Sequence, residues 1–377
     1  MEYRQLYGMK EKPSLLGFGC MRLPLLPGGG RGDIDYDRAQ SMIDDAIANG
    51  VNYFDTAYGY LDGQSEIFVG KALKKYPRDS FYLASKLPMG QIDSYEKGIE
   101  IFNHQFEKLQ VEYIDFYMFH GINKTVFTEK VLKFGLLDEM RKMKESGRIR
   151  NLGFSFHGSY EDFEYIMNYC DWDFCQIQYN YMDTEIQAGD RGVALAAERK
   201  VPLIIMEPVK GGSLASFAPA AEKIFKDYAP EKSLASWAVR WVAAHPGVAV
   251  VLSGMSTEEQ VKDNLETFNH YVPLNAEEQG VIDQVVAAIR SSIRNGCTGC
   301  NYCMPCPFGV DIPRNFSIWN DYGMYNNAGR AKDNLNRLDA DKWANKCAEC
   351  GACEAACPQA LPIREDLKKM FAEISAL

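Results

Sequence analysis

The sequence predicts an α/β fold, a (β/α)8 TIM barrel followed by a small, mainly α-helical domain that is rich in cysteine. The chain has 377 residues, which suits a barrel of about 250 residues and one further module. Between about residues 15 and 256, eight short β-branched or aromatic runs alternate with longer amphipathic stretches. Eight of the 11 cysteines lie in two short runs near the C-terminus. We therefore expect a barrel domain over 1–290 and a second domain over 291–377.

The expected barrel strands are apolar runs of parallel-sheet type. They lie at 15–21, 52–57, 81–86, 114–120, 149–156, 174–180, 202–208 and 248–255. After the last strand, the run Ser256-Thr257-Glu258-Glu259 has the spacing of a capping box that opens a helix. A further helix over 275–294 should close the barrel domain. No G-x-G-x-x-G follows the first strand, so an open doubly wound sheet is disfavoured, and the glycine-rich stretch 28–32 is expected to be an ordinary loop.

Composition limits the function classes. The formal net charge of −10 argues against nucleic acid as a partner, because phosphate binding needs basic surface. No window approaches the ~18 unbroken apolar residues of a membrane helix, and the first residues do not have the pattern of an export signal. We therefore expect a cytoplasmic protein without a membrane or nucleic-acid partner.

The two cysteine runs indicate iron–sulfur clusters. The second run matches the bacterial ferredoxin spacing C-x2-C-x2-C-x3-C-P, and the first has one residue fewer before its last cysteine. Under the ferredoxin crossing rule, Cys306 and Cys357 each serve the cluster of the other run. One [4Fe-4S] cluster would take Cys297, Cys300, Cys303 and Cys357, and the other would take Cys347, Cys350, Cys353 and Cys306. The segment between the runs looks partly helical, so the module resembles the α-helical dicluster ferredoxins.

Two alternatives apply to the cysteines. Eight thiolates could form a pair of four-cysteine zinc sites, although structural zinc usually takes two separated C-x2-C pairs and not triplets that end in Cys-Pro. The three scattered cysteines, Cys20, Cys170 and Cys175, are expected to be small buried hydrophobic residues.

Four polar side chains are expected at neighbouring strand ends of the barrel, where barrel enzymes carry their active sites. They are Asp55, Tyr60, Lys86 and His120. An acid, a phenol, an ammonium group and an imidazole at one mouth suit proton transfer to a carbonyl oxygen. A lysine cation favours phenolate, so we expect it to bring the tyrosine pKa down from about 10. Each residue alone also has a structural reading, as half of a buried ion pair, a strand-end tyrosine or a core histidine.

The runs NYFDTAYGY, SEIFVGKAL, LASK and DFYMFH resemble successive signatures of the aldo-keto reductase family over nearly all of residues 1–270. The resemblance implies that Asp55, Tyr60, Lys86 and His120 form the family's catalytic tetrad, with Tyr60 as acid or base. Tyr58 is the rival tyrosine, and we expect it to pack beside the site.

The family also binds a nicotinamide cofactor, NAD or NADP, across the barrel mouth. The positions that match its cofactor contacts are Ser155, Gln176, Met206, Ser253, Gly254, Gln260 and Asn264. The resemblance places Ser155 and Gln176 at the carboxamide and Asn264 at the adenine. Met206 stands where an aromatic residue usually stacks on the nicotinamide. Gly254 and Gln260 replace the Lys and Arg that many members use for the 2′-phosphate of NADPH.

The two halves transfer electrons differently, because a hydride carries two electrons and each cluster passes one. We expect an oxidoreductase that acts on a small-molecule carbonyl or hydroxyl substrate, with clusters that pass electrons to or from a carrier such as a ferredoxin or flavoprotein. A bound flavin, such as FMN, could split the two-electron step. The alternative is an electron-transfer adaptor subunit of a larger redox complex with a non-catalytic barrel. In a third reading the clusters are structural or sense oxygen.

Overall fold

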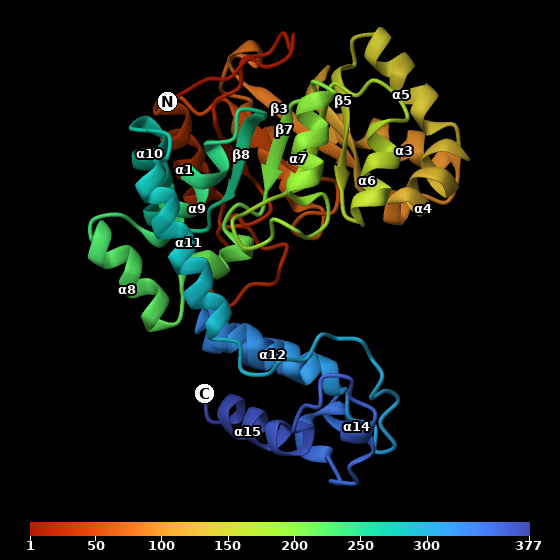
Figure 1. Cartoon of the computed structure of the whole chain (residues 1–377). Coiled ribbons are helices and arrows are strands. Elements are labelled where there is room, and N and C mark those ends of the chain that lie inside the picture. The colour runs from red at the N-terminus through yellow and green to blue at the C-terminus, as the bar shows by residue number, and fades with distance from the viewer. The chain divides into compact units, whose positions relative to one another are not determined.

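The computed structural model describes all residues from 1 to 377, and residues 16–254 contain a closed barrel of eight parallel strands (Figure 1). The strands follow one another in chain order, and the eighth pairs with the first. They are β1 (Leu16–Gly19), β2 (Tyr53–Asp55), β3 (Tyr82–Leu87), β4 (Ile114–Ile122), β5 (Ile149–Phe156), β6 (Phe174–Gln178), β7 (Leu203–Met206) and β8 (Val248–Gly254). Each strand coincides with its expected run to within a few residues, so the TIM-barrel prediction is confirmed.

Helices alternate with these strands. They are α1 (Tyr36–Ala48), α2 (Gln64–Leu73), α3 (Tyr95–Leu109), α4 (Lys124–Val126), α5 (Leu136–Glu145), α6 (Tyr160–Met167), α7 (Gly189–Glu198), α9 (Leu234–Ala243) and α10 (Glu258–Asn269). Helix α10 is present as predicted, but its cap lies one residue later than the capping-box spacing indicated. Thr257 is the N-cap and accepts from the Gln260 N–H group. The Gln260 side chain accepts from Ser256 N at 2.7 Å, so the reciprocal bond is displaced by one residue.

The barrel interior is filled by apolar side chains. The rings of Tyr53 and Phe174 each pack edge-on against Phe116, with centroids 5.1 and 5.2 Å apart. A Cβ atom at Gly17 would lie 2.6 Å from Val250 Cγ1, so only glycine fits where these strands meet. Because the interior is packed, a substrate can reach the barrel only at the strand ends.

The chain divides into two compact units, which we describe separately. The first comprises residues 1–210 and 236–274, and the second comprises residues 211–235 and 275–377. The domain boundary that the sequence suggests at residue 290 stays a prediction. Helices of the second unit are α8 (Pro219–Tyr228), α11 (Ala276–Ser291), α12 (Ile312–Tyr325), α13 (Ala328–Asn336), α14 (Ala352–Ala355) and α15 (Ile363–Ser375). Asn275 and Glu278 form a capping box at the start of α11.

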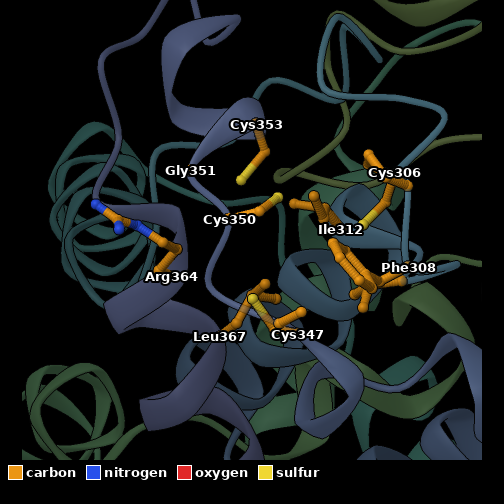
Figure 2. Close-up of a pocket in the computed structure, with 12 residues that line it drawn as sticks. Cys306, Phe308, Ile312, Cys347, Cys350, Gly351, Cys353, Arg364 and Leu367 are labelled. Carbon is orange, nitrogen blue, oxygen red and sulfur yellow. The ribbon is translucent and has the colours of Figure 1, made fainter.

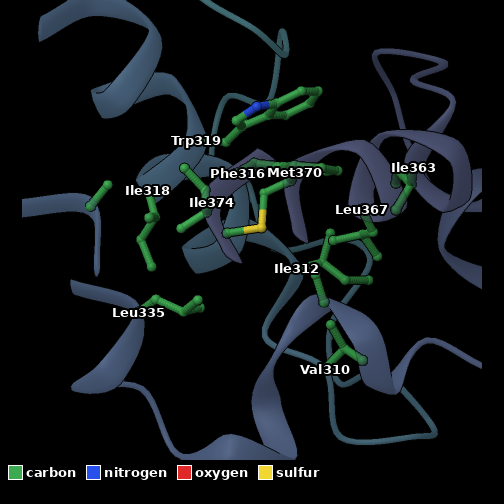
Figure 3. Close-up of a cluster of buried hydrophobic side chains, with 12 residues drawn as sticks. Val310, Ile312, Phe316, Ile318, Trp319, Leu335, Ile363, Leu367, Met370 and Ile374 are labelled. Atoms are coloured by element: carbon green, nitrogen blue, oxygen red, sulfur yellow. The ribbon is translucent and has the colours of Figure 1, made fainter. Parts of the chain in front are cut away.

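The second unit has its own hydrophobic core between α12, α13 and α15 (Figure 3). Phe316 and Met370 are fully buried in it, and cysteines of both runs pack against its edge. Trp319 Nε1 donates a hydrogen bond of 2.6 Å to Glu373 Oε2, which joins α12 to α15. The mainly helical character expected of this domain is confirmed. None of the helices is both long and apolar enough to traverse a lipid bilayer.

Candidate active site and cysteine cavities

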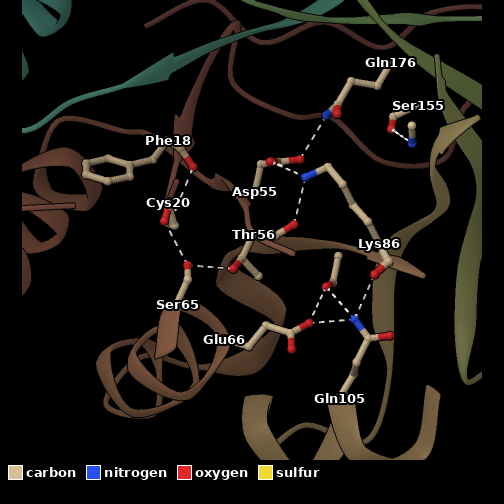
Figure 4. A network of polar contacts seen from close by, with 12 residues as sticks. Phe18, Cys20, Asp55, Thr56, Ser65, Glu66, Lys86, Gln105, Ser155 and Gln176 are labelled. Atoms are coloured by element: carbon tan, nitrogen blue, oxygen red, sulfur yellow. Dashed lines mark hydrogen bonds and ion pairs between the residues drawn. The ribbon is translucent and has the colours of Figure 1, made fainter. Parts of the chain in front are cut away.

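Asp55 and Lys86 form a buried ion pair at the carboxyl ends of β2 and β3. Lys86 Nζ lies 2.5 Å from Asp55 Oδ1 and donates a second hydrogen bond of 2.8 Å to the carbonyl oxygen of Thr56 (Figure 4). Neither side chain is more than 5% exposed. Burial lowers the pKa of Lys86, but Asp55 and Tyr60 together more than offset this, so the pKa is raised overall and the lysine stays cationic.

The loop after β2 brings Tyr60 beside this pair. Lys86 Nζ lies 4.8 Å from the centroid of the Tyr60 ring. The His120 ring on β4 meets Tyr60 edge-on, with centroids 5.8 Å apart. Tyr58 instead places its hydroxyl 3.0 Å from His104 Nδ1. The structure therefore brings Tyr60, and not Tyr58, next to Lys86 and His120.

The pKa of Tyr60 is raised, which corrects the expectation that the neighbouring lysine would lower it. Burial is the largest cause and the Asp55 carboxylate adds to it, so together they outweigh the Lys86 cation. Tyr60 is thus a protonated phenol at neutral pH and is ready to act as an acid. Burial, and then the Lys86 cation, lowers the pKa of His120 to about 3. His120 is therefore a neutral imidazole that can form hydrogen bonds but carries no charge at neutral pH.

Ser155 and Gln176 lie opposite each other on the paired strands β5 and β6. Ser155 Oγ accepts a hydrogen bond of 2.7 Å from the Gly121 N–H group, so its own proton is left for a ligand. Gln176 Nε2 donates to Asp55 Oδ2 at 3.0 Å, which leaves Gln176 Oε1 as an acceptor (Figure 4). One donor and one acceptor side by side match a carboxamide group, which offers one acceptor and one amino group.

The residues that the resemblance assigns to the adenine and the 2′-phosphate lie at the end of β8 and on α10. Asn264 Nδ2 donates to Ser253 Oγ at 2.9 Å, and both side chains are largely buried. The Gln260 side chain accepts a hydrogen bond from Ser256 N at the start of α10. The Arg22 side chain lies across Gly254, because a Cβ atom there would meet its carbon atoms at 3.2–3.3 Å. Sequence reasoning missed Arg22, since its loop follows β1 and no motif links it to β8.

Met206 is the last residue of β7, so it lies at the strand ends, and it is half-buried. Its place beside a nicotinamide stays a prediction. Cys20 and Cys175 are fully buried, and burial raises the pKa of both thiols, with a smaller contribution from Asp55 at Cys20. This is the environment of a small hydrophobic side chain. Cys170 is only partly buried, with Arg141 near its thiol.

A second polar cluster lies behind β3 and was not assigned from the sequence. It contains Ser85, Glu66, Gln105 and Lys108, all of them buried. Glu66 belongs to the family-like run SEIFVGKAL and Ser85 to the run LASK, but neither run indicated a buried cluster with Gln105 and Lys108.

The eight clustered cysteines line two cavities. One cavity is lined by Cys306, Cys347, Cys350 and Cys353, whose side chains surround a common space in Figure 2. The other is lined by Cys297, Cys300, Cys303 and Cys357. Each cavity thus receives three cysteines of one run and the last cysteine of the other run.

The two cavities have the same set of donors, four cysteine thiols each, so the same kind of group would suit both. Both are otherwise lined mainly by apolar residues, and Ile312 contributes to both walls. No three His, Cys, Asp or Glu side chains come together closely enough to hold a single metal ion. Four thiol donors around an apolar cavity suit a [4Fe-4S] cluster.

Comparisons with protein families agree with the two halves. The model of the aldo/keto reductase family matches residues 15–287, and the model of the 4Fe-4S dicluster domain matches residues 296–361.

Comparisons with individual proteins match the barrel. An aldo-keto reductase of Glycine max is 31% identical over 150 residues, which cover 38% of this chain and 41% of that protein. The NADH-specific methylglyoxal reductase of Escherichia coli K12 is 23% identical over 306 residues, which cover 68% of this chain and 90% of that protein. The holo form of an aldo-keto reductase from Bacillus halodurans aligns with a TM-score of 0.63 at 28% identity, covering 76% of this chain and 96% of the other.

Proposed function

The chain belongs to the aldo/keto reductase family, and we propose that its barrel reduces or oxidises a carbonyl or hydroxyl group of a small molecule with NADH or NADPH. The C-terminal domain binds two [4Fe-4S] clusters that exchange electrons with a carrier. The observation that carries the proposal is the position of Tyr60 beside Lys86 and His120 at the strand ends, where barrel enzymes have their active sites.

In carbonyl reduction, Tyr60 donates the proton. Its raised pKa keeps the phenol protonated at neutral pH, and it gives that proton to the substrate oxygen as negative charge develops there. Lys86, held by Asp55, stabilises the phenolate that remains. Neutral His120 orients the substrate oxygen by a hydrogen bond. The reduced nicotinamide, when bound, supplies the hydride for the carbonyl carbon.

Ser155 and Gln176 support the nicotinamide assignment, because their free donor and acceptor complement a carboxamide. Gly254 and Gln260 offer no cation for a 2′-phosphate, which favours NADH over NADPH. The Escherichia coli relative is named as NADH-specific and acts on methylglyoxal, so small aldehydes are suitable first substrates. The ratio of kcat/KM for the two cofactors tests this preference, and Arg22→Gln tests whether Arg22 supplies the missing cation.

The cysteine cavities support the cluster assignment, with Cys306 and Cys357 exchanged between the two runs. A cytoplasmic, reducing compartment suits such thiolate ligands. A ferredoxin or a flavoprotein is a suitable carrier, since it handles single electrons. Anaerobic titration with NADH tests whether the halves communicate, because bleaching of the cluster absorbance requires a group that splits the hydride, such as FMN. Analysis of the same preparation for released flavin shows whether the chain itself holds that group.

The proposal is tested by anaerobic assays of methylglyoxal reduction with the whole chain and with Tyr60→Phe. We expect turnover by the natural chain and its near-complete loss in the variant. The barrel is a non-catalytic platform if a donor protein reduces the clusters of both the natural chain and the variant while neither protein acts on any carbonyl or alcohol.

A further inference from the structure

A buried ion pair joins two helices behind the active site. Glu66 on α2 and Lys108 on α3 lie 2.8 Å apart, and their side chains are 0% and 7% exposed. Glu66 Oε1 also accepts hydrogen bonds of 2.6 Å from Ser85 Oγ and from Gln105 Nε2 (Figure 4). None of these four side chains belongs to the tetrad.

The cluster reaches both catalytic segments through their main chain. Gln105 Nε2 donates to the carbonyl oxygen of Lys86 at 3.1 Å, and Gln105 Oε1 accepts from the Tyr117 hydroxyl on β4 at 2.5 Å. Lys108 Nζ donates to the carbonyl oxygen of Tyr58 at 3.1 Å and lies 4.3 Å from the Tyr58 ring centroid. The ion pair is therefore connected to β3, which carries Lys86, and to the loop that carries Tyr60.

That loop is strained. Leu61 and Asp62, which follow Tyr60, have φ angles of 52° and 53°, in the left-handed region that favours glycine. Such a conformation is unfavourable for residues other than glycine and persists only where surrounding contacts hold it. The hydrogen bond from Lys108 to the carbonyl oxygen of Tyr58 is one of those contacts.

The buried Glu66–Lys108 pair is not explained by a gain in folding stability. A buried ion pair gains little over well-packed apolar side chains, because both groups lose their hydration. The cluster instead donates hydrogen bonds to the carbonyl oxygens of Lys86 and of Tyr58, which is two residues before Tyr60. We therefore expect its main effect on the position of the catalytic side chains.

We propose that Glu66, Lys108 and Gln105 are positioning residues that hold Tyr60 against Lys86. This inference rests on the proposed function of the tetrad. Loss of the pair should release the strained loop and increase the separation of the Tyr60 oxygen from the Lys86 cation.

The test compares Glu66→Gln, Lys108→Met and the double variant with Asp115→Asn as the matched control. Asp115 is equally buried and pairs with Arg78 and Arg150 at 2.6 and 3.0 Å. It also accepts from the Leu83 N–H group on β3 at 3.0 Å, but it contacts neither the Lys86 carbonyl oxygen nor the loop that carries Tyr60. We expect kcat for methylglyoxal reduction to fall about 10- to 100-fold in Lys108→Met, as for a misplaced catalytic group, with the KM for NADH unchanged. The double variant should lose no more than the worse single variant, because the pair acts as a unit. Asp115→Asn should lower thermal stability without changing kcat.

A second readout does not need turnover. The groups that face Tyr60 are Cys20, Asp55, Lys86 and His120. The 13C shift of the Tyr60 ring, assigned with Tyr60→Phe, reports its titration, and the Tyr60 pKa should rise further in Lys108→Met because the Lys86 cation then lies farther from the phenol oxygen. If that pKa and kcat both match the natural chain while stability falls as in Asp115→Asn, the pair is only structural and the inference is wrong. If the natural chain reduces no carbonyl but the tyrosine pKa still shifts, the proposed function fails and the positioning role stands.

Discussion

Replacing Lys86 by methionine removes the ammonium group that lies 2.5 Å from the buried Asp55 carboxylate. The carboxylate keeps one hydrogen bond, from Gln176 Nε2 at 3.0 Å. Breaking a buried pair by deleting one partner costs about 3–5 kcal/mol, because the remaining charge is uncompensated. We expect the barrel of this variant to lose about that much stability at pH 7.

The loss should depend on pH, because Asp55 can escape it by binding a proton. In the variant the buried carboxylate has lost its cation, so the folded protein should take up a proton at a higher pH than the unfolded chain does. Across that pH range the folded state binds more protons than the unfolded state, so stability falls as pH rises. The destabilisation should therefore be small near pH 4 and grow by about 1.4 kcal/mol per pH unit until the folded-state pKa is passed.

Native-state hydrogen exchange of the β2 and β3 amides measures this loss within the barrel alone. The double variant Asp55→Asn with Lys86→Met serves as control, since it has no buried charge and should recover part of the stability at pH 7. A destabilisation that is the same at pH 5 and pH 7, or a double variant as unstable as the single one, would refute the reasoning.

Three further outcomes are expected. Tyr60→Phe keeps the ring but removes the proton, so kcat for carbonyl reduction should fall by about 10²–10⁴-fold with little change in NADH binding, measured by fluorescence titration. Because the pKa of Tyr60 is raised, the reduction rate should stay level through neutral pH and fall only in the alkaline range, whereas alcohol oxidation, which needs phenolate, should rise about tenfold per pH unit below that pKa. A flat oxidation profile would exclude Tyr60 as the base. Cys306→Ser should impair the cluster of Cys347, Cys350 and Cys353 and spare the other in EPR spectra; impairment of the Cys297 cluster instead would reverse the crossed assignment.

The barrel could be predicted from the sequence because its strands are short apolar runs at regular spacing. The same spacing placed Asp55 and Lys86 at adjacent strand ends, where the structure pairs them. The pKa of Tyr60 could not be predicted in this way. Its direction depends on how much solvent the fold removes, and the lysine that would lower it is itself balanced by Asp55.

Contacts between side chains of different helices also could not be predicted from the sequence. Glu66 and Lys108 lie 42 positions apart, and each alone looks like a surface residue of an amphipathic helix. Only the packing of α2 and α3 against β3 brings them together. Arg22 was missed for a similar reason, since its contact with Gly254 joins the first strand end to the last.

The central claim is that the chain combines a proton-donating barrel with two four-cysteine cluster sites, and metal analysis of anaerobically purified protein tests the cluster half most directly. The account predicts iron and acid-labile sulfide in equal amounts, on the order of eight of each per chain. Zinc in place of iron, or iron without sulfide, would contradict it.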